Sequence, residues 1–244
     1  MTPAASAKII AHRGGVVGDE FAENSPASLE AAVDRNYWMI EVDIRKSKDG
    51  RLVVQHDPDF RRFYGETRLA SEMNWQEIAE LRAEPGGSRP LQFHELGALA
   101  KGRLRLMLDT KPTRQSDAYF EGVRRVLDEN NLLDTAYVIN TQHAERWLRA
   151  GARVGVPLAD VEAAAKRGED VVRSYFVFEH GRDLDGDKVR RGQELGVPVV
   201  PTINIFHYAD RPDHMREAEA DVGRMLDLGV EEFQIDSPYD IWLR

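Results

Sequence analysis

The sequence predicts an α/β fold, a single-domain (β/α)8 (TIM) barrel, from three observations. The chain has 244 residues, a length at which one α/β barrel is common. Strand-like and helix-like segments alternate with short connections, which is typical of right-handed βαβ units in a parallel sheet. Eight main strands are expected, and no G-x-G-x-x-G motif follows the first, as an open dinucleotide-binding sheet would require.

The first strand–helix unit has clear boundaries. Residues 7–12 form a short apolar strand, and a glycine-containing loop leads to the segment 25–36. Ser25 is a good helix N-cap and Pro26 suits the first helical position. A helix is therefore expected to begin there.

The second strand, at 37–44, is expected to carry an extra hairpin partner. The turn KSKDG follows it, and the apolar stretch 51–57 runs back from that turn. Residues 58–103 are less regular and read as an insertion after the second strand. A short helix is expected at 74–83, and the glycine–proline break EPGGSRP follows it.

From residue 103 onwards the alternation of strands and helices becomes regular. Neither a linker nor a low-complexity segment interrupts it, so one domain is expected over residues 1–244. The remaining strands are expected at 103–111, 136–140, 153–156, 174–179, 197–205 and 231–238, and the helices at about 115–129, 144–151, 159–168, 186–195 and 213–228.

The composition limits the classes of partner. Asp and Glu number 42 against 33 Lys and Arg, so the net charge is −9. Nucleic acids and anionic membranes demand a basic face, so a small-molecule partner is expected instead. The absence of cysteine removes disulfides, thiolate zinc sites and cysteine nucleophiles. The oligomeric state stays open.

The apolar runs and the start of the sequence bear on location. No apolar run approaches the length of a membrane span, so no integral membrane segment is expected. The start, MTPAASAKII, lacks the charged leader and apolar stretch of a signal peptide. A cytoplasmic protein is expected from the sequence as written, and a secreted or periplasmic one if a leader has been removed.

Two carboxylates stand near the end of the second strand, at the side where barrel enzymes place their active sites. Glu41 and Asp43 are two positions apart, so both side chains point to one face of the strand. His56 arrives nearby, at the end of the hairpin partner. Converging carboxylates beside a histidine predict a hard-cation site with an acid–base group.

Further ionisable residues end the neighbouring strands. His12 and Arg13 end the first strand, and Asp109 and Lys111 end the third with the same alternate spacing. Taken singly, these residues also suit a core histidine or a structural salt bridge, and an E-x-D pair is more often a solvated face. Four successive strand ends with ionisable groups favour the functional interpretation.

These motifs carry a resemblance to a known family. The segments AHRGG, ENSPASLEAAV and IEVDIRKSKDGRLVVQHDPDF follow one another in this order. Their HR-G, E-N-[ST], E-x-D, SKDG and HD elements resemble the glycerophosphodiester phosphodiesterase family. The resemblance is strong over about residues 8–112, and the ending GVEEFQIDSP is similar to the family's closing G-x-D-G-I-x-T-D-x-P.

The resemblance implies an activity and a set of site residues. The family is a (β/α) barrel that hydrolyses phosphodiesters with a bound divalent cation. Here it implies cleavage of glycerophosphodiesters to glycerol 3-phosphate and an alcohol, with one Ca²⁺ or Mg²⁺. The implied residues are His12 and His56 as general acid and base, Glu41, Asp43 and Asp109 as metal ligands, and Arg13, Glu23, Asn24 and Lys111 as substrate-binding residues.

Three departures from the family pattern bear on the site. Asp109 replaces the usual glutamate, so its carboxylate reaches about one methylene less far, although the related sphingomyelinase D enzymes resemble this pattern. The loop at 14–22 looks slightly longer than usual. Pro201 stands where the family often has the tryptophan of a W-T-x-N motif, which implies an altered wall on the alcohol side.

Two other functions stay open at this point. A lipid phosphodiesterase of the lysophospholipase D or sphingomyelinase D type would need an apolar entrance, which Ile205, Phe206 and Tyr208 supply if they do not belong to the core. A non-catalytic phospho-ligand-binding barrel is the other, and the Asp109 and Pro201 departures give it some weight.

Overall fold

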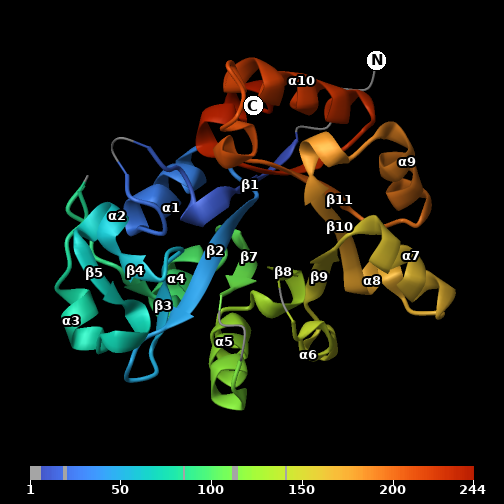
Figure 1. Ribbon diagram of the computed structural model, residues 1–244. Coiled ribbons are helices and arrows are strands. Elements are labelled where there is room, and N and C mark those ends of the chain that lie inside the picture. Colours follow the sequence, from blue (N-terminus) through green and yellow to red (C-terminus); the bar gives the residue numbers. More distant parts are fainter. Residues whose placement is uncertain (1–6, 19–20, 85, 112–114, 141) are drawn as a thin grey trace.

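The computed structural model confirms the predicted (β/α)8 barrel. In the described part of the chain, eight parallel strands form a closed ring with helices around it (Figure 1). The strand order is β1-β12-β11-β10-β9-β8-β7-β2, and β2 pairs with β1 to close the ring. The structure describes residues 7–18, 21–84, 86–111, 115–140 and 142–244.

The barrel strands are short, as the apolar runs predict. The strands are β1 (Lys8–Ala11), β2 (Met39–Lys46), β7 (Arg105–Thr110), β8 (Tyr137–Ile139), β9 (Arg153–Val156), β10 (Tyr175–His180), β11 (Val199–Ile203) and β12 (Glu232–Ile235). Their mutual pairings are parallel, and Asp43 on β2 lies directly beside Asp109 on β7.

Helices cover the outside of the barrel. They are α1 (Pro26–Asp34), α4 (Phe93–Ala100), α5 (Asp117–Glu129), α6 (Ala144–Ala150), α7 (Leu158–Lys166), α8 (Val171–Ser174), α9 (Gly186–Glu194) and α10 (His214–Asp227). Helix α1 begins where predicted: the Ser25 hydroxyl accepts from the Ser28 backbone N–H, and the Ser28 hydroxyl accepts from that of Ser25. Among the described residues, no helix is both long and apolar enough to cross a bilayer.

The predicted hairpin after β2 is present and begins the insertion. Strand β3 (Leu52–Val54) runs antiparallel to β2. The insertion continues through β4 (Asp59–Phe60), α2 (Arg61–Tyr64), β5 (Glu66–Leu69), α3 (Trp75–Ala79) and β6 (Leu91–Gln92), at the left of Figure 1. Helix α3 is shorter than the predicted 74–83. The insertion has a small core of its own, in which Phe60, Met73 and Ile78 are fully buried.

Alternation along the strands separates two apolar regions and thereby positions the site. On β2, Ile40, Val42 and Ile44 belong to the main core that the helices also line. Met39 belongs to a second cluster with residues of five other barrel strands, namely Ile10, Met107, Tyr137, Phe176 and Val200. The next residues of the same parity on β2 are Glu41 and Asp43. The barrel interior therefore changes from apolar to ionisable toward the C-terminal ends of its strands.

Candidate active site

Three carboxylates converge at the C-terminal ends of β2 and β7. Ligand-type oxygen atoms of Glu41, Asp43 and Asp109 lie within 4.8 Å of one another. The three residues are buried, with exposed fractions of 1%, 1% and 6%. Buried carboxylates at such distances repel one another strongly unless a proton or a cation compensates them.

The charges of this cluster are compensated in two ways. Burial raises the pKa of Glu41 well above its ordinary value, and the charges of Asp43 and Asp109 raise it further. Burial also acts to raise the pKa of Asp43, but the nearby Lys111 ammonium, foremost among neighbouring charges, brings it below its ordinary value. Lys111 Nζ lies 2.9 Å from Asp43 Oδ1 and 2.7 Å from Asp109 Oδ2.

The cluster fits a hard divalent cation. Carboxylate oxygens are the donors that Ca²⁺ and Mg²⁺ prefer, and a cation would displace the proton that burial holds on Glu41. Asp43 Oδ1 is buried and, besides its ion pair with Lys111, accepts no well-aligned hydrogen bond among the described residues. Asn140 supports the cluster from β8's end, because its Nδ2 donates to Asp109 Oδ2 at 3.1 Å.

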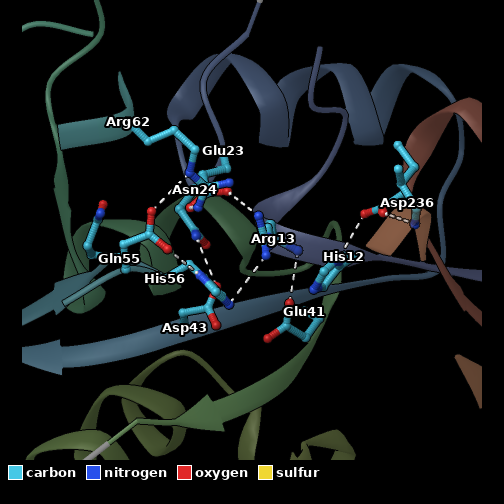
Figure 2. Close-up of polar contacts among 12 residues, drawn as sticks. His12, Arg13, Glu23, Asn24, Glu41, Asp43, Gln55, His56, Arg62 and Asp236 are labelled. Atoms are coloured by element: carbon cyan, nitrogen blue, oxygen red, sulfur yellow. Dashed lines mark hydrogen bonds and ion pairs between the residues drawn. The ribbon is translucent and has the colours of Figure 1, made fainter. Parts of the chain in front are cut away.

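His12 forms a pair with Asp236, which follows β12. His12 Nδ1 lies 2.7 Å from Asp236 Oδ1 (Figure 2). The other oxygen, Oδ2, accepts from the backbone N–H of Ile205 at 2.6 Å. Burial acts to raise the pKa of Asp236, but its bond to His12 and the neighbouring charges bring it below its ordinary value. An ionised Asp236 places the imidazole proton on Nδ1 and turns Nε2 away from this partner.

His56 forms a second pair, with Asp57. His56 Nδ1 lies 2.8 Å from Asp57 Oδ1, and Asp57 Oδ2 accepts from Arg62 Nε at 2.9 Å. His56 Nε2 faces Arg13 Nη2 at 3.4 Å. Burial, as the largest influence, lowers the pKa of His56. His56 is therefore neutral near pH 7, and the lone pair on its Nε2 faces the guanidinium of Arg13.

Arg13 joins these groups from a strained turn. Its φ of 56° is left-handed, which costs an ordinary residue about 1–2 kcal/mol. In return, its backbone N–H donates to Glu41 Oε2 at 2.9 Å, and its Nη1 donates to Glu23 Oε2 at 3.2 Å (Figure 2). Gly14 permits this turn: its φ is 84°, and a Cβ there would lie 2.6 Å from the Cα of Asn24.

Glu23 and Asn24 lie behind the charged residues. Asn24 Nδ2 donates to Asp43 Oδ2 at 3.1 Å, and Asn24 also has a left-handed φ, of 53°. Glu23 is 3% exposed and accepts from both Arg13 and Arg62. Burial, partly opposed by these two arginines, raises the pKa of Glu23 to about 7. Both residues contact the residues that line the cavity rather than lining it themselves.

A cavity of about 470 Å³ contains most of the predicted residues on one side. We call this the charged side; it comprises His12, Arg13, Glu41, His56, Asp109 and Lys111. Four further lining residues, on β11 and β12 and in the turn after β11, are buried and polar and carry no formal charge at neutral pH. We call these the polar wall; they are Thr202, Asn204, His207 and Gln234.

Sequence reasoning missed several of these residues. Asp57 directly follows His56 and Asp236 stands in the quoted ending QIDSP, so both were visible as strand-end carboxylates. Arg62 gave no signal, because its link to His56 runs through Asp57. Pro201 is buried on β11 and is not among the residues lining the cavity, whereas its neighbour Thr202 is. The residue at 201 therefore does not form the wall expected of it.

A larger hollow, of about 710 Å³, lies at the opposite end of the barrel, where β1, β2 and β7 begin. Its cations already have partners. Lys8 pairs with Glu231 and Glu232, and the Arg105 guanidinium lies 4.8 Å from the Trp38 ring centroid. The converging carboxylates and the two histidine–aspartate pairs lie at the other end, which favours the smaller cavity as the site.

Comparisons with known proteins point to one family. The sequence model of the glycerophosphoryl diester phosphodiesterase family matches residues 12–150. The chain is 24% identical to a probable glycerophosphodiester phosphodiesterase 2 of Mycobacterium tuberculosis over 237 residues, covering 91% of this chain and 84% of that protein. It is 32% identical to the uncharacterized protein YqiK of Bacillus subtilis over 79 residues, 32% of each chain.

The fold has solved counterparts as well. A crystal structure of a glycerophosphoryl diester phosphodiesterase from Parabacteroides distasonis superposes with a TM-score of 0.79. The two chains are 18% identical, and the match covers 99% of this chain and 86% of the other. The likeness at this identity concerns the barrel fold.

Proposed function

The chain belongs to the glycerophosphoryl diester phosphodiesterase family, and we propose that it is a metal-dependent hydrolase that cleaves glycerophosphodiesters to glycerol 3-phosphate and an alcohol. One observation carries this proposal. Three buried carboxylates, Glu41, Asp43 and Asp109, meet between two histidine–aspartate pairs in a cavity of a suitable size for a small phosphodiester.

A phosphodiester monoanion needs its charge offset before a nucleophile can approach. Glu41, Asp43 and Asp109 would hold one Ca²⁺ or Mg²⁺, and this cation, when bound, supplies Lewis acidity at a phosphate oxygen. In our proposal Arg13 and Lys111 bind the other phosphate oxygens. Both side chains line the cavity, which supports that role.

We assign the base role to His56 and the acid role to His12. The lowered pKa of His56 and the lone pair on its Nε2 suit it to remove a proton from the nucleophile. His12 donates a proton from Nε2 to the departing alcohol oxygen, while Asp236 stabilises the charged imidazole through Nδ1. Asp57 orients His56 in the same manner.

Glu23 and Asn24 act as positioning residues in this scheme. Asn24 fixes one oxygen of Asp43 through Nδ2, and Glu23 holds the guanidinium of Arg13. Their contribution to substrate binding is therefore exerted through Asp43 and Arg13.

Hydrolysis by the chelator-stripped protein, resupplied with Ca²⁺, Mg²⁺ or Mn²⁺, tests the proposal. Suitable esters are glycerophosphocholine, glycerophosphoinositol, a lysophospholipid and bis-p-nitrophenyl phosphate. We expect metal-dependent turnover that falls about 10²–10⁴-fold in His12→Ala and in His56→Ala. His94→Ala, at an exposed position on α4, is the matched control and should behave as wild type. Near-full activity of both catalytic variants would contradict the mechanism.

A lipid phosphodiesterase is the second candidate, because Ile205 and Phe206 beside the cavity are 41% and 57% exposed. Preference for the lysophospholipid over the water-soluble esters would favour it. Absence of turnover together with tight metal binding would favour a non-catalytic phospho-ligand-binding barrel.

A further inference from the structure

The polar wall consists of polar side chains that are buried and yet line the cavity. Thr202, Asn204, His207 and Gln234 are 4%, 2%, 4% and 3% exposed, yet all of them line the cavity. They come from the ends of β11 and β12 and from the turn after β11. Buried polar groups on a cavity wall are retained where a ligand or water completes their hydrogen bonds.

The internal hydrogen bonds of the wall leave specific groups for a ligand. Asn204 Nδ2 donates to Gln234 Oε1 at 3.1 Å, and the Asn204 backbone N–H donates to His207 Nδ1 at 3.2 Å. Asn204 Oδ1 is buried and has no hydrogen-bond partner among the described residues. A buried oxygen of this kind is costly to leave without a donor, and a ligand hydroxyl supplies one.

His207 contributes a donor without a charge. Because Nδ1 accepts the backbone hydrogen bond, the neutral ring carries its proton on Nε2, which lies 3.4 Å from Thr202 Oγ1 within the wall. Burial first, and then the neighbouring His180 ring at 4.0 Å, lower the pKa of His207 to about 4. At neutral pH the wall therefore offers donors and acceptors together and no net charge.

The carboxylates near the wall are already paired. Glu179 Oε2 lies 2.6 Å from Lys188 Nζ, and its Oε1 accepts from the backbone N–H of Leu158. Asp236 is occupied by His12 and by the backbone N–H of Ile205. Among the described residues, this side of the cavity thus has no free counter-ion for an ammonium group.

Phe206 completes the surface at the rim. Its ring is 57% exposed, and its centroid lies 6.1 Å from that of His12 and 4.1 Å from that of His207. The negative face of an aromatic ring complements the polarised C–H groups of a cyclic polyol. The position beside His12 is also where a departing alcohol would receive its proton.

We propose that the polar wall and Phe206 form a subsite for an uncharged polyhydroxylated alcohol, the departing group of the phosphodiester. This proposal rests on the proposed function, since the alcohol is placed by the acid role of His12. It adds a preference that the reaction itself does not require: hydroxyl-rich leaving groups over quaternary ammonium alcohols.

The experiment compares kcat/KM for glycerophosphoinositol and glycerophosphocholine, with bis-p-nitrophenyl phosphate as an ester that carries neither group. We expect the inositol ester to exceed the choline ester by about 10-fold or more, the value of one or two satisfied hydrogen bonds. Asn204→Asp replaces the amide by an isosteric carboxylate and should shift this ratio about 10-fold toward choline. Phe206→Ala, at a position that is 57% exposed, removes a ring face on which either alcohol can pack, and it should raise KM for both esters.

Equal or better turnover of the choline ester, preference for a lysophospholipid, or an equal effect of Asn204→Asp on both esters would overturn the subsite. Absence of turnover of all esters would refute the proposed function instead. In that case ligand-observed NMR of the two glycerophosphodiesters still decides: saturation transfer to the inositol ring that Asn204→Asp and Phe206→Ala weaken supports the subsite, and equal transfer to inositol and choline refutes it.

Discussion

The charged side and the polar wall line one cavity but differ in how their residues interact. The charged side draws its residues from positions 12 to 111, and its groups hold one another by ion pairs and shifted pKa values. The polar wall draws its residues from positions 202 to 234 and bonds through neutral groups. The family match, which ends at residue 150, includes the first region and not the second. In the proposed scheme, therefore, most residues of the reaction and those of the alcohol subsite come from different stretches of the chain, and Asp236 is the exception.

The largest expected difference between the two regions comes from the carboxylates. Glu41→Gln should lower turnover by about 10³-fold, because it removes a ligand from a charge site on which the transition state depends. Gln234→Leu, in the polar wall, should lower it less than about 10-fold. The measurement is the activity of wild type, Glu41→Gln and Gln234→Leu under saturating metal. Glu162→Gln on α7, away from the cavity, is the control. A larger loss of turnover in Gln234→Leu than in Glu41→Gln would contradict the proposed division of roles between the two regions.

Calorimetric titration with Ca²⁺ and Mg²⁺ sharpens the same comparison. Binding should be lost in Glu41→Gln and retained in Gln234→Leu. The metal-free Glu41→Gln protein should be at least as stable as wild type, since the substitution relieves the burial of a repelled carboxyl. Loss of stability in the metal-free variant would contradict that account of the cluster.

Asp236 connects the two regions, and its removal should have an intermediate effect. Asp236→Asn should lower kcat about 10–100-fold with little change in KM, because it changes the tautomer and orientation of His12 without touching substrate. The pH–rate profile separates this role from a structural one: the limb that reports the acid should shift in the variant. An unchanged profile with a fallen kcat would exclude a positioning role.

Glu23 lies behind the charged side, and its titration can be tested by measuring stability alone. Its folded pKa of about 7 lies above the value of 4.5 for an ordinary glutamate, so its contribution to stability is complete below about pH 4.5 and is lost as the pH rises through 7. Wild type should therefore lose about 2–3 kcal/mol relative to Glu23→Gln between pH 5 and pH 8. Urea unfolding at both values measures this change.

Glu30→Gln is the control for that measurement. The Arg103 hydrogen bond lowers the pKa of Glu30, so the contribution of Glu30 to stability is present above about pH 4.5 and is lost only at lower pH. Wild type should therefore neither gain nor lose stability relative to this variant between pH 5 and pH 8. Parallel pH dependence of the two variants would contradict the assignment of the raised pKa to Glu23.

The smallest effect is expected at Pro201. Pro201→Ala should change the ratio of kcat/KM for the inositol and choline esters by less than about twofold, because the side chain does not reach the cavity. The same assay used for Asn204→Asp measures it. A larger change would mean that the alcohol side extends beyond the polar wall.

Much of the charged side is predictable from the sequence because strand alternation is a local rule. The spacing of Glu41 and Asp43 within one eight-residue strand indicates that both side chains lie on the same face. The count of eight strands predicts a barrel in which the C-terminal ends of the strands meet. The same alternation could have placed Pro201 outside the cavity, since Thr202 and Val200 share the inward parity.

The remaining contacts depend on distances along the chain that no local rule covers. The partner of His12 is 224 positions away, and it is set by the register of β1 against β12, in which Ala11 lies beside Ile235. The polar wall depends on a turn after β11 that brings His207 back onto Asn204. Neither the strand register nor the conformation of this turn can be predicted from the amino-acid composition or from the spacing of residue types.

The pairing of β1 with β12 joins the first and last strands of the barrel, so it can form only late in synthesis. At about 5–20 residues per second, a ribosome delivers Asp236 roughly 10–45 s after His12. Throughout this interval one edge of β1 has no neighbour, and the acid of the proposed reaction has no carboxylate to hold it. A nascent or truncated chain that stops short of β12 therefore lacks both the neighbour of this edge and the carboxylate that pairs with His12. The pairing that closes the barrel is thus also the event that completes the His12–Asp236 pair.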